Sequence, residues 1–187
     1  MKLNIATKLL AGFGVVLALM GIVGYVGITN MGNLTALMQE MYADRTVPIG
    51  DLGEANSRLH RLRVNLYAIL LEKDRAKMAD LNGKLVDNRQ EVDARIEKYG
   101  KTYLVKEEQE WLAKFNAAWP AYKTQVEKAV GLKLDGKDDE AYQAVYGAGG
   151  TMEKLTPVQE ALQKLVDVNV RVAQELNKES AATAESS

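Results

Sequence analysis

The sequence predicts an all-α protein, an antiparallel up-down-up-down four-helix bundle preceded by a transmembrane helix. Three observations lead to this fold class. Residues 9–28 contain no charged side chain. After residue 30, apolar residues recur at three- and four-residue steps, the period of an amphipathic helix. No stretch combines alternating polarity with β-branched enrichment, so we expect no sheet.

Composition excludes several classes of function. The chain has 187 residues, and its 24 Lys and Arg against 25 Asp and Glu give a net charge of −1, so we expect no nucleic-acid partner. It has no cysteine and one histidine. The absence of cysteine excludes thiol catalysis, disulfides and cysteine-ligated metals. With a single histidine, we expect no Ser/His/Asp triad. Its carboxylates lack a plausible acid–base partner, so we expect no enzyme, resident metal or cofactor.

The apolar segment at residues 9–28 is long enough to cross a bilayer. Its 20 residues span about 30 Å as a helix. Lys2 and Lys8 are the only charges at its N-terminal side, and the positive-inside rule then places residues 1–8 in the cytoplasm and residues 29–187 outside. A cleaved signal peptide is the alternative, but the segment is long for one and no clear cleavage site follows.

The soluble part is expected to contain four long helices. The first runs over about 30–75, continuous with the membrane helix and bent at Pro48. The second and third cover about 75–99 and 106–134. The fourth begins near 138, is interrupted by the glycines of 147–150, and resumes at about 151. Short connections between such helices indicate an up-down-up-down bundle. The residues expected to face inward are Leu52, Ala55, Leu59, Leu62, Leu66, Ile69, Leu81, Leu85, Val92, Ile96, Trp111, Leu112, Phe115, Trp119, Tyr122, Val126, Val130, Leu134, Leu155, Leu162, Leu165, Val168 and Val172.

The chain resembles the ligand-binding domain of bacterial methyl-accepting chemotaxis receptors. The resemblance rests on the membrane segment Met1–Gly27, on TVPIGDLGEANSRLHRLRVNLY at 46–67, and on the tail from Asn169 to Ser187. It covers the whole chain, mostly as helix pattern and spacing. It implies a homodimer in the bacterial inner membrane, with a periplasmic or extracellular sensor domain that binds ligand at the membrane-distal part of the dimer interface. It also implies a second membrane helix, a HAMP relay and a cytoplasmic coiled coil that controls a kinase and its adaptor, all absent here, so we expect the chain to be a fragment.

The residues that hold the ligand in the best-known members of this family, the aspartate receptors, are only partly present. Those receptors carry Arg-x-Asn-Leu-x-Arg-x-x-x-Arg on their first helix. Arg63 and Asn65 match this pattern, whereas Ala68 and Glu72 stand at the other two arginine positions. On the fourth helix, Gly147 stands where those receptors have a threonine. Aspartate and serine are therefore poor candidates for the ligand.

An anion site is the functional hypothesis that the residues favour. We hypothesise that Arg58, Arg61 and Arg63 form a relocated clamp for an organic acid, aromatic or dicarboxylic, because guanidinium groups suit bidentate carboxylate recognition. On a helical wheel, Arg58 and Arg61 lie on one flank of the core stripe and Arg63 on the other. The other candidates are the rings of Tyr67, Tyr142 and Tyr146 and the backbone amides of the glycine-rich stretch that begins at Gly147.

Each candidate also has an ordinary structural interpretation. Three arginines on one helix are often a solvated face paired with acids. Tyr142 and Tyr146 are four residues apart, a spacing that also fits two core residues on one helix face. The glycine run also fits a simple helix break with no ligand-binding role. Asp138, Asp139 and Glu140 fit a helix start better than a metal site.

Other functions fit the same sequence. The outer domain of a membrane histidine kinase or of a cyclic-dinucleotide enzyme would have the same sequence features. These proteins differ from chemotaxis receptors in their cytoplasmic part. A purely structural bundle, or one that senses through another binding protein, would also fit. A haem-binding bundle would need His60 with a methionine, but His60 lies away from the core stripe.

Overall fold

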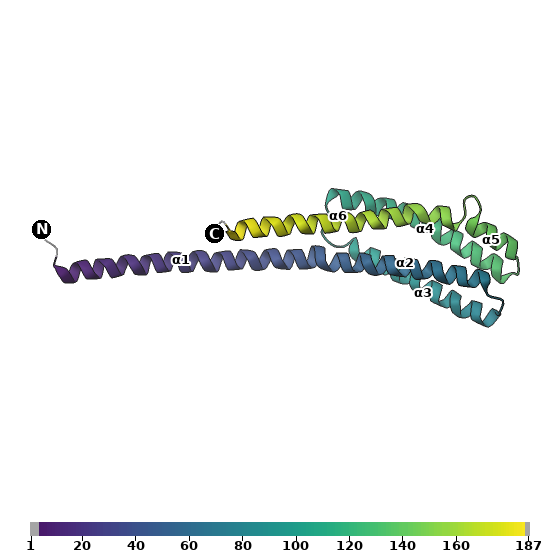
Figure 1. Ribbon diagram of the computed structural model, residues 1–187, viewed down its shortest axis with the longest axis horizontal. Helices are drawn as coiled ribbons and strands as arrows, with labels where there is room; N and C mark the ends of the chain where they lie inside the picture. The colour runs from purple at the N-terminus through teal and green to yellow at the C-terminus, as the bar shows by residue number, and fades with distance from the viewer. Residues whose placement is uncertain (1–3, 186–187) are drawn as a thin grey trace. The chain divides into compact units, whose positions relative to one another are not determined.

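The computed structural model describes residues 4–185, and within that range the chain forms helices joined by short turns, with no strand (Figure 1). The all-α prediction is thus confirmed. Lys2 of the predicted cytoplasmic segment and Ser187 at the end of the predicted sensor domain lie outside the described residues. In chain order the helical segments are α1 (Ile5–Met41), the π-helical turn η1 (Tyr42–Thr46), α2 (Val47–Leu71), α3 (Arg75–Tyr99), α4 (Lys106–Leu134), α5 (Asp138–Tyr146) and α6 (Thr151–Glu185).

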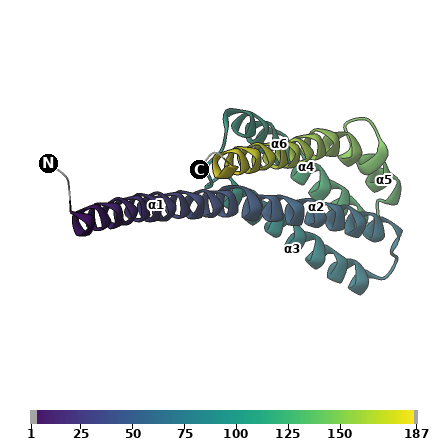
Figure 2. The same cartoon turned by 60° about the vertical axis from the view of Figure 1, so that its left-hand side comes forward.

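The chain divides into two compact units. One contains α1 and the C-terminal part of α6 from Glu175, and the other extends from Tyr42 to Gln174. Within the second unit, α3 lies alongside α2 and α5 lies alongside α4 (Figures 1 and 2). The connections between α2 and α3, between α3 and α4 and between α4 and α5 are short, so each of these helices runs opposite to the one before it. The fourth arm of the predicted up-down-up-down bundle is the pair α5 and α6.

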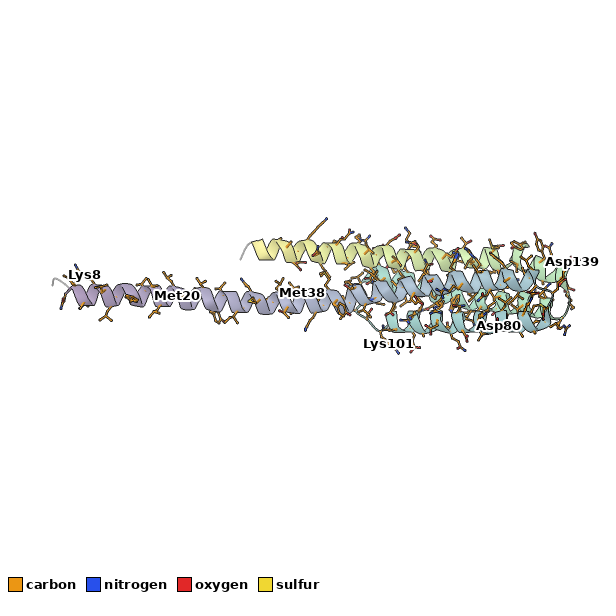
Figure 3. The ribbon with its side chains drawn as sticks, turned by 60° about the horizontal axis from the view of Figure 1, so that its bottom comes forward. Lys8, Met20, Met38, Asp80, Lys101 and Asp139 are labelled. Atoms are coloured by element: carbon orange, nitrogen blue, oxygen red, sulfur yellow. The ribbon has the colours of Figure 1, made fainter. Side chains whose placement is uncertain are left out.

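Helix α1 is apolar and has no buried residue. Figure 3 shows its side chains, Met20 and Met38 among them, projecting around the helix. It is the one stretch of the described chain that is long and apolar enough to cross a membrane. A membrane helix has this character, because lipid covers the apolar side chains that a soluble helix would have to bury.

The predicted bend at Pro48 corresponds to a local change of helix type. The backbone widens into η1 directly before Pro48, which lies in the first turn of α2. Proline has no amide hydrogen to donate to the preceding turn, and its ring crowds the carbonyl four residues earlier. A π-helical turn at this place accommodates both effects without ending the helix.

The expected helix boundaries follow from local chemistry. Asp74 caps α3, since its Oδ1 accepts hydrogen bonds from the amides of Ala76 and Lys77 at 2.8 and 3.4 Å. Gly100 ends the same helix. The turn between α4 and α5 contains Gly136 with φ of +77°, a backbone conformation that glycine adopts without a steric penalty.

The interruption predicted at residues 147–150 separates α5 from α6. Gly149 has φ of +70°. A Cβ atom on Gly150 would lie 2.6 Å from the carbonyl oxygen of Val145, and one on Gly147 would lie 2.6 Å from that of Gln143. Only glycine fits these close approaches of backbone to backbone, which explains the glycine content of the segment.

The core of the bundle is the predicted apolar stripe. All six inward residues of α2 are at most 1% exposed, and α3, α4 and α6 contribute matching stripes. The aromatic residues of α4 pack in a row, with ring centroids of Phe115, Trp119 and Tyr122 5.7 Å apart in each successive pair. Some predicted core residues lie only at its edge, namely Leu81, Trp111, Leu112, Leu134 and Val172, which are half-buried.

A buried carboxylate joins α2 to α3. Asp51 is 5% exposed and pairs with Arg95 Nη1 at 2.8 Å and with Lys98 Nζ at 2.7 Å. Burial acts to raise the pKa of Asp51, but the hydrogen bonds and charges of Lys98 and Arg95 outweigh it and hold the pKa below its ordinary value. Asp51 is therefore ionised at neutral pH and holds the two helices together.

Candidate functional site

Three tyrosines from two helices meet at the end of the bundle where α2 ends. Tyr67 of α2 stacks on Tyr146 of α5, with ring centroids 6.0 Å apart and planes 20° apart. Tyr142 packs on Tyr146 at 4.7 Å. The Tyr67 hydroxyl donates a hydrogen bond to Met152 Sδ at the start of α6. We call Tyr67, Tyr142, Tyr146 and Met152 the tyrosine cluster.

The tyrosine cluster is open to solvent. Tyr142, Tyr146 and Met152 are 55%, 47% and 42% exposed, whereas Tyr67 is half-buried beneath them. The alternative interpretation of Tyr142 and Tyr146 as core residues is therefore wrong, because α5 turns this face outward. An exposed aromatic patch of this kind is typical of a binding surface.

Arg63 is the cation beside the tyrosine cluster. Arg63 lies four residues before Tyr67 on α2, so the two side chains share one face of the helix. Burial raises the pKa of the Tyr67 hydroxyl, and the positive charge of Arg63 partly opposes that rise. Tyr67 is accordingly protonated at neutral pH and donates its hydrogen bond. Arg63 Nη2 lies 3.1 Å from His60 Nδ1, and it has no carboxylate partner among residues 4–185. It therefore remains available for a carboxylate ligand.

The other two arginines line a separate groove between α2 and α3. Its volume is about 360 Å³ and Arg58, Arg61, Lys84 and Asn88 line it, but Arg63 does not. Arg58 donates to Glu54 Oε1 at 2.6 Å, whereas Arg61 is exposed and pairs with no carboxylate of the described chain. The chain thus does not bring the three arginines of the predicted clamp together, in agreement with their opposite flanks on the helical wheel.

The glycine segment offers no free amide at its three glycines. The amide of Gly147 donates to Gln143 O at 2.8 Å, that of Gly149 to Glu153 Oε2 at 2.7 Å, and that of Gly150 to Gly147 O at 2.9 Å. The expectation that these amides would hold an anion is therefore not supported. Gly147 lies next to Tyr146 and lets the chain turn at the edge of the tyrosine cluster.

A buried polar network that sequence reasoning missed lies around Glu108, in the first turn of α4. Its Oε2 accepts hydrogen bonds from Arg45 Nη1 at 3.0 Å and from the Val105 amide at 2.8 Å. Its Oε1 accepts from Tyr99 Oη at 2.7 Å and from Asn169 Nδ2 at 2.8 Å. We call Arg45, Tyr99, Glu108 and Asn169 the Glu108 network.

All four side chains of the Glu108 network are at most 2% exposed. Burial raises the pKa of Tyr99 and the charge of Glu108 raises it further, so Tyr99 stays protonated and donates. The one signal in the sequence is that Glu108 lies three residues after Val105, the residue before the helix, where a glutamate commonly accepts a hydrogen bond from the N-cap amide. That signal predicts the bond to Val105 but not the other three partners.

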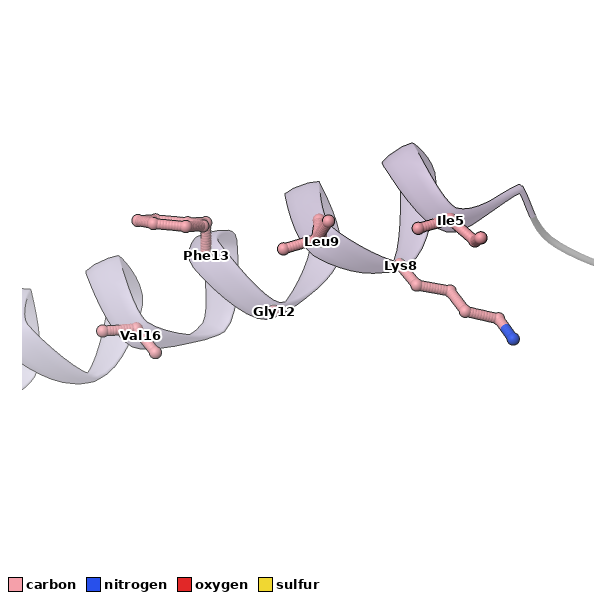
Figure 4. Close-up of a pocket in the computed structure, with 6 residues that line it drawn as sticks. All are labelled: Ile5, Lys8, Leu9, Gly12, Phe13 and Val16. Carbon is pink, nitrogen blue, oxygen red and sulfur yellow. The ribbon is translucent and has the colours of Figure 1, made fainter.

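A hollow along α1 is unrelated to the candidate site. Ile5, Lys8, Leu9, Gly12, Phe13 and Val16 line it, and all belong to one helix (Figure 4). Apart from the Lys8 ammonium, its lining is apolar. Such a surface fits contact with lipid rather than with a polar ligand. Among residues 4–185, no group of three or more histidine, aspartate or glutamate side chains is placed to hold a metal ion.

The described chain thus combines a helical bundle that carries an exposed tyrosine cluster with one apolar helix that is long enough to cross a membrane. The chain matches the family described as a four helix bundle sensory module for signal transduction over residues 2–184, and it therefore belongs to this family of chemotaxis-receptor modules. No individual curated protein matches it. The family is a sensory module and not a catalytic domain.

Proposed function

We propose that this sensory module detects a small organic acid, preferably an aromatic one, and that the tyrosine cluster and Arg63 bind it. The observation that carries the proposal is the meeting of α2, α5 and α6 in an exposed aromatic surface beside a cation with no carboxylate partner. These residues are far apart in the sequence, and aromatic rings from two helices that gather at an exposed surface indicate a binding site more than core packing.

The chemistry of the site suits such a ligand. The ring of an aromatic acid would stack on Tyr142 or Tyr146, which adds to the free energy gained from burial of apolar area. Its carboxylate would pair with the planar guanidinium of Arg63, and the tyrosine hydroxyls would donate further hydrogen bonds. Glu72, close by in sequence at the end of α2, would disfavour a ligand with a second carboxylate on that side.

The membrane arrangement and the dimer are part of the same proposal. Residues 1–8 would be cytoplasmic, residues 9–28 would span the inner membrane, and residues 29–187 would form the sensor domain outside. In a homodimer, each protomer would contribute its own tyrosine cluster and its own Arg63. The support for this arrangement is the apolar α1, the charge of Lys8 at its start, and membership of the receptor family.

Signalling would follow from a shift in population between two arrangements of the helices. A ligand changes such an equilibrium only by the difference in its affinity for the two states. The tyrosine cluster contains the first residues of α6, so its occupancy would favour one axial position of that helix. A displacement of α6 by 1–2 Å, the scale typical of such transitions, would reach a kinase and adaptor through a second membrane helix beyond this chain.

The proposal predicts a ligand-dependent rise in melting temperature. The chain in lipid nanodiscs would be screened against aromatic, dicarboxylic and amino acids by thermal unfolding. A compound at 100 times its Kd stabilises the folded state by about 2.7 kcal/mol, which is about 5–10 °C for a domain of this size. Arg63→Ala and Tyr146→Ala should each abolish the rise.

The matched control for this screen is Arg61→Ala, because Arg61 is an exposed arginine two positions away on α2 that lies in the other groove. It should leave the rise intact. A loss of the rise in Arg61→Ala alone would move the site to the α2–α3 groove and contradict the proposal. The absence of any hit on a folded, dimeric chain would instead favour sensing through another binding protein.

A further inference from the structure

Asn169 is the buried polar residue in an otherwise apolar stretch of the inner face of α6. We propose that Glu108 is a positioning residue, and that its hydrogen bond with Asn169 is a latch that fixes the axial register of α6 against α4. The inference rests on the proposed signalling role of α6, because a helix that signals by sliding needs a defined resting position.

The composition of α6 explains why this hydrogen bond selects one register. Between Leu155 and Val168 every buried residue of α6 is apolar, namely Leu155, Val158, Ala161, Leu162, Leu165 and Val168. Apolar contacts alone tolerate sliding, since one aliphatic side chain replaces another. A displaced α6 would instead place an aliphatic group against the buried Glu108 carboxylate, which would lose a donor and gain none. A single buried asparagine fixes the register of coiled coils by the same effect.

The geometry shows that Glu108 is a common anchor for four parts of the bundle. Its partners come from η1, from the end of α3, from the residue before α4, and from α6. Three of these partners lie outside α6 and hold the carboxylate in place from other sides. The hydrogen bond to Asn169 is therefore the one of the four that breaks when α6 moves alone.

The Glu108 network leaves two of its buried polar atoms without a hydrogen-bond partner. Arg45 Nε and Asn169 Oδ1 are both buried and have no hydrogen-bond partner. Buried polar atoms without partners are unfavourable. A second arrangement that supplies partners to these two atoms would offset the loss of the Asn169–Glu108 bond, and two arrangements of similar free energy are what a switch requires.

The Glu108 network also includes a residue of η1, the π-helical turn that follows α1. Arg45 lies in η1, directly between α1 and α2, and its guanidinium binds the same carboxylate as Asn169. Single π-helical turns within α-helices occur frequently at functional sites. Release of Asn169 therefore changes the surroundings of a residue that adjoins the candidate membrane helix.

The latch can be tested without a ligand, by measuring the position of α6 relative to α4. Because the chain has no cysteine, Glu110→Cys on α4 and Lys164→Cys on α6 introduce two exposed sites for spin labels. The distance between the labels would be measured by pulsed electron paramagnetic resonance on the full chain in nanodiscs. Asn169→Leu is expected to shift the distance by about 1–2 Å or to add a second population, the scale of helix shifts in such transitions.

Two variants that change other contacts near the Asn169–Glu108 hydrogen bond serve as controls. Arg171→Gln removes the exposed ion pair of Arg171 with Glu107, which joins the same two helices beside the latch. Tyr99→Phe removes a different donor to Glu108 and leaves the Asn169–Glu108 hydrogen bond in place. Both should leave the distance unchanged. Asn169→Ser, whose hydroxyl is too short to replace the amide, serves if Asn169→Leu does not fold.

The outcomes separate this inference from the proposed function. A folded Asn169 variant with the distance distribution of the unmodified chain would overturn the latch, whatever the ligand screen shows. A shift in Tyr99→Phe or Arg171→Gln equal to that in Asn169→Leu would also overturn it, because any weakening of the bundle would then move α6. A screen without hits would overturn the ligand proposal and leave the distance result as it stands.

Discussion

Replacement of Glu108 by alanine is expected to lower the free energy of unfolding by about 3–5 kcal/mol, the range for a buried ion pair that loses one partner. The variant leaves the Arg45 guanidinium 2% exposed with no opposite charge. It also leaves the Tyr99 hydroxyl and the Asn169 amide without their acceptor. Chemical denaturation followed by far-ultraviolet circular dichroism measures the loss.

The matched control is Glu107→Ala, at the neighbouring position. Glu107 pairs with Arg171 at an exposed site, and such pairs contribute about 0–1 kcal/mol. Replacement of both charges by apolar groups, Arg45→Met with Glu108→Leu, should recover much of the stability, because no charge is then buried alone. An equal effect of Glu107→Ala and Glu108→Ala would contradict the importance that we assign to the buried network.

Replacement of Leu66 by alanine is expected to lower the free energy of unfolding by about 2–5 kcal/mol. Leu66 of the α2 stripe is fully buried, so the variant loses apolar burial and leaves a cavity that close-packed neighbours fill only in part. The same denaturation experiment measures the effect.

Leu71→Ala provides the control with the same change on the same helix. Leu71 is 83% exposed, and surface substitutions of this kind change stability by about 0.5 kcal/mol or less. If Leu71→Ala proved as destabilising as Leu66→Ala, the apolar stripe of α2 would not be the core that the structure shows.

Much of the fold could be predicted because local chemistry determines it. The 3.6-residue period of the α2 stripe indicated which face turns inward, and Gly100 and the glycines of 147–150 indicated where helices end. These signals act within a few residues, so they are visible in the sequence alone. The same holds for the split of the arginines, which followed from their angles around α2.

The candidate site was only partly predictable. Tyr67, Tyr142 and Tyr146 were candidates, and the structure brings them together, but spacing alone did not show that α5 turns its tyrosines outward. The Glu108 network could not be predicted, because its four side chains come from segments up to 124 positions apart, between residues 45 and 169. A charged residue near a helix start has the same local pattern whether it is solvated or buried.

The most direct test of the sensor mechanism is whether ligand binding moves α6. The labelled pair Glu110→Cys and Lys164→Cys would be measured with and without a saturating hit from the acid screen, in the otherwise unmodified chain and in Tyr146→Ala. We predict that the compound shifts the distance in the first and not in the second. A compound that raises the melting temperature but leaves the distance unchanged would contradict the mechanism, since binding would then not be coupled to α6.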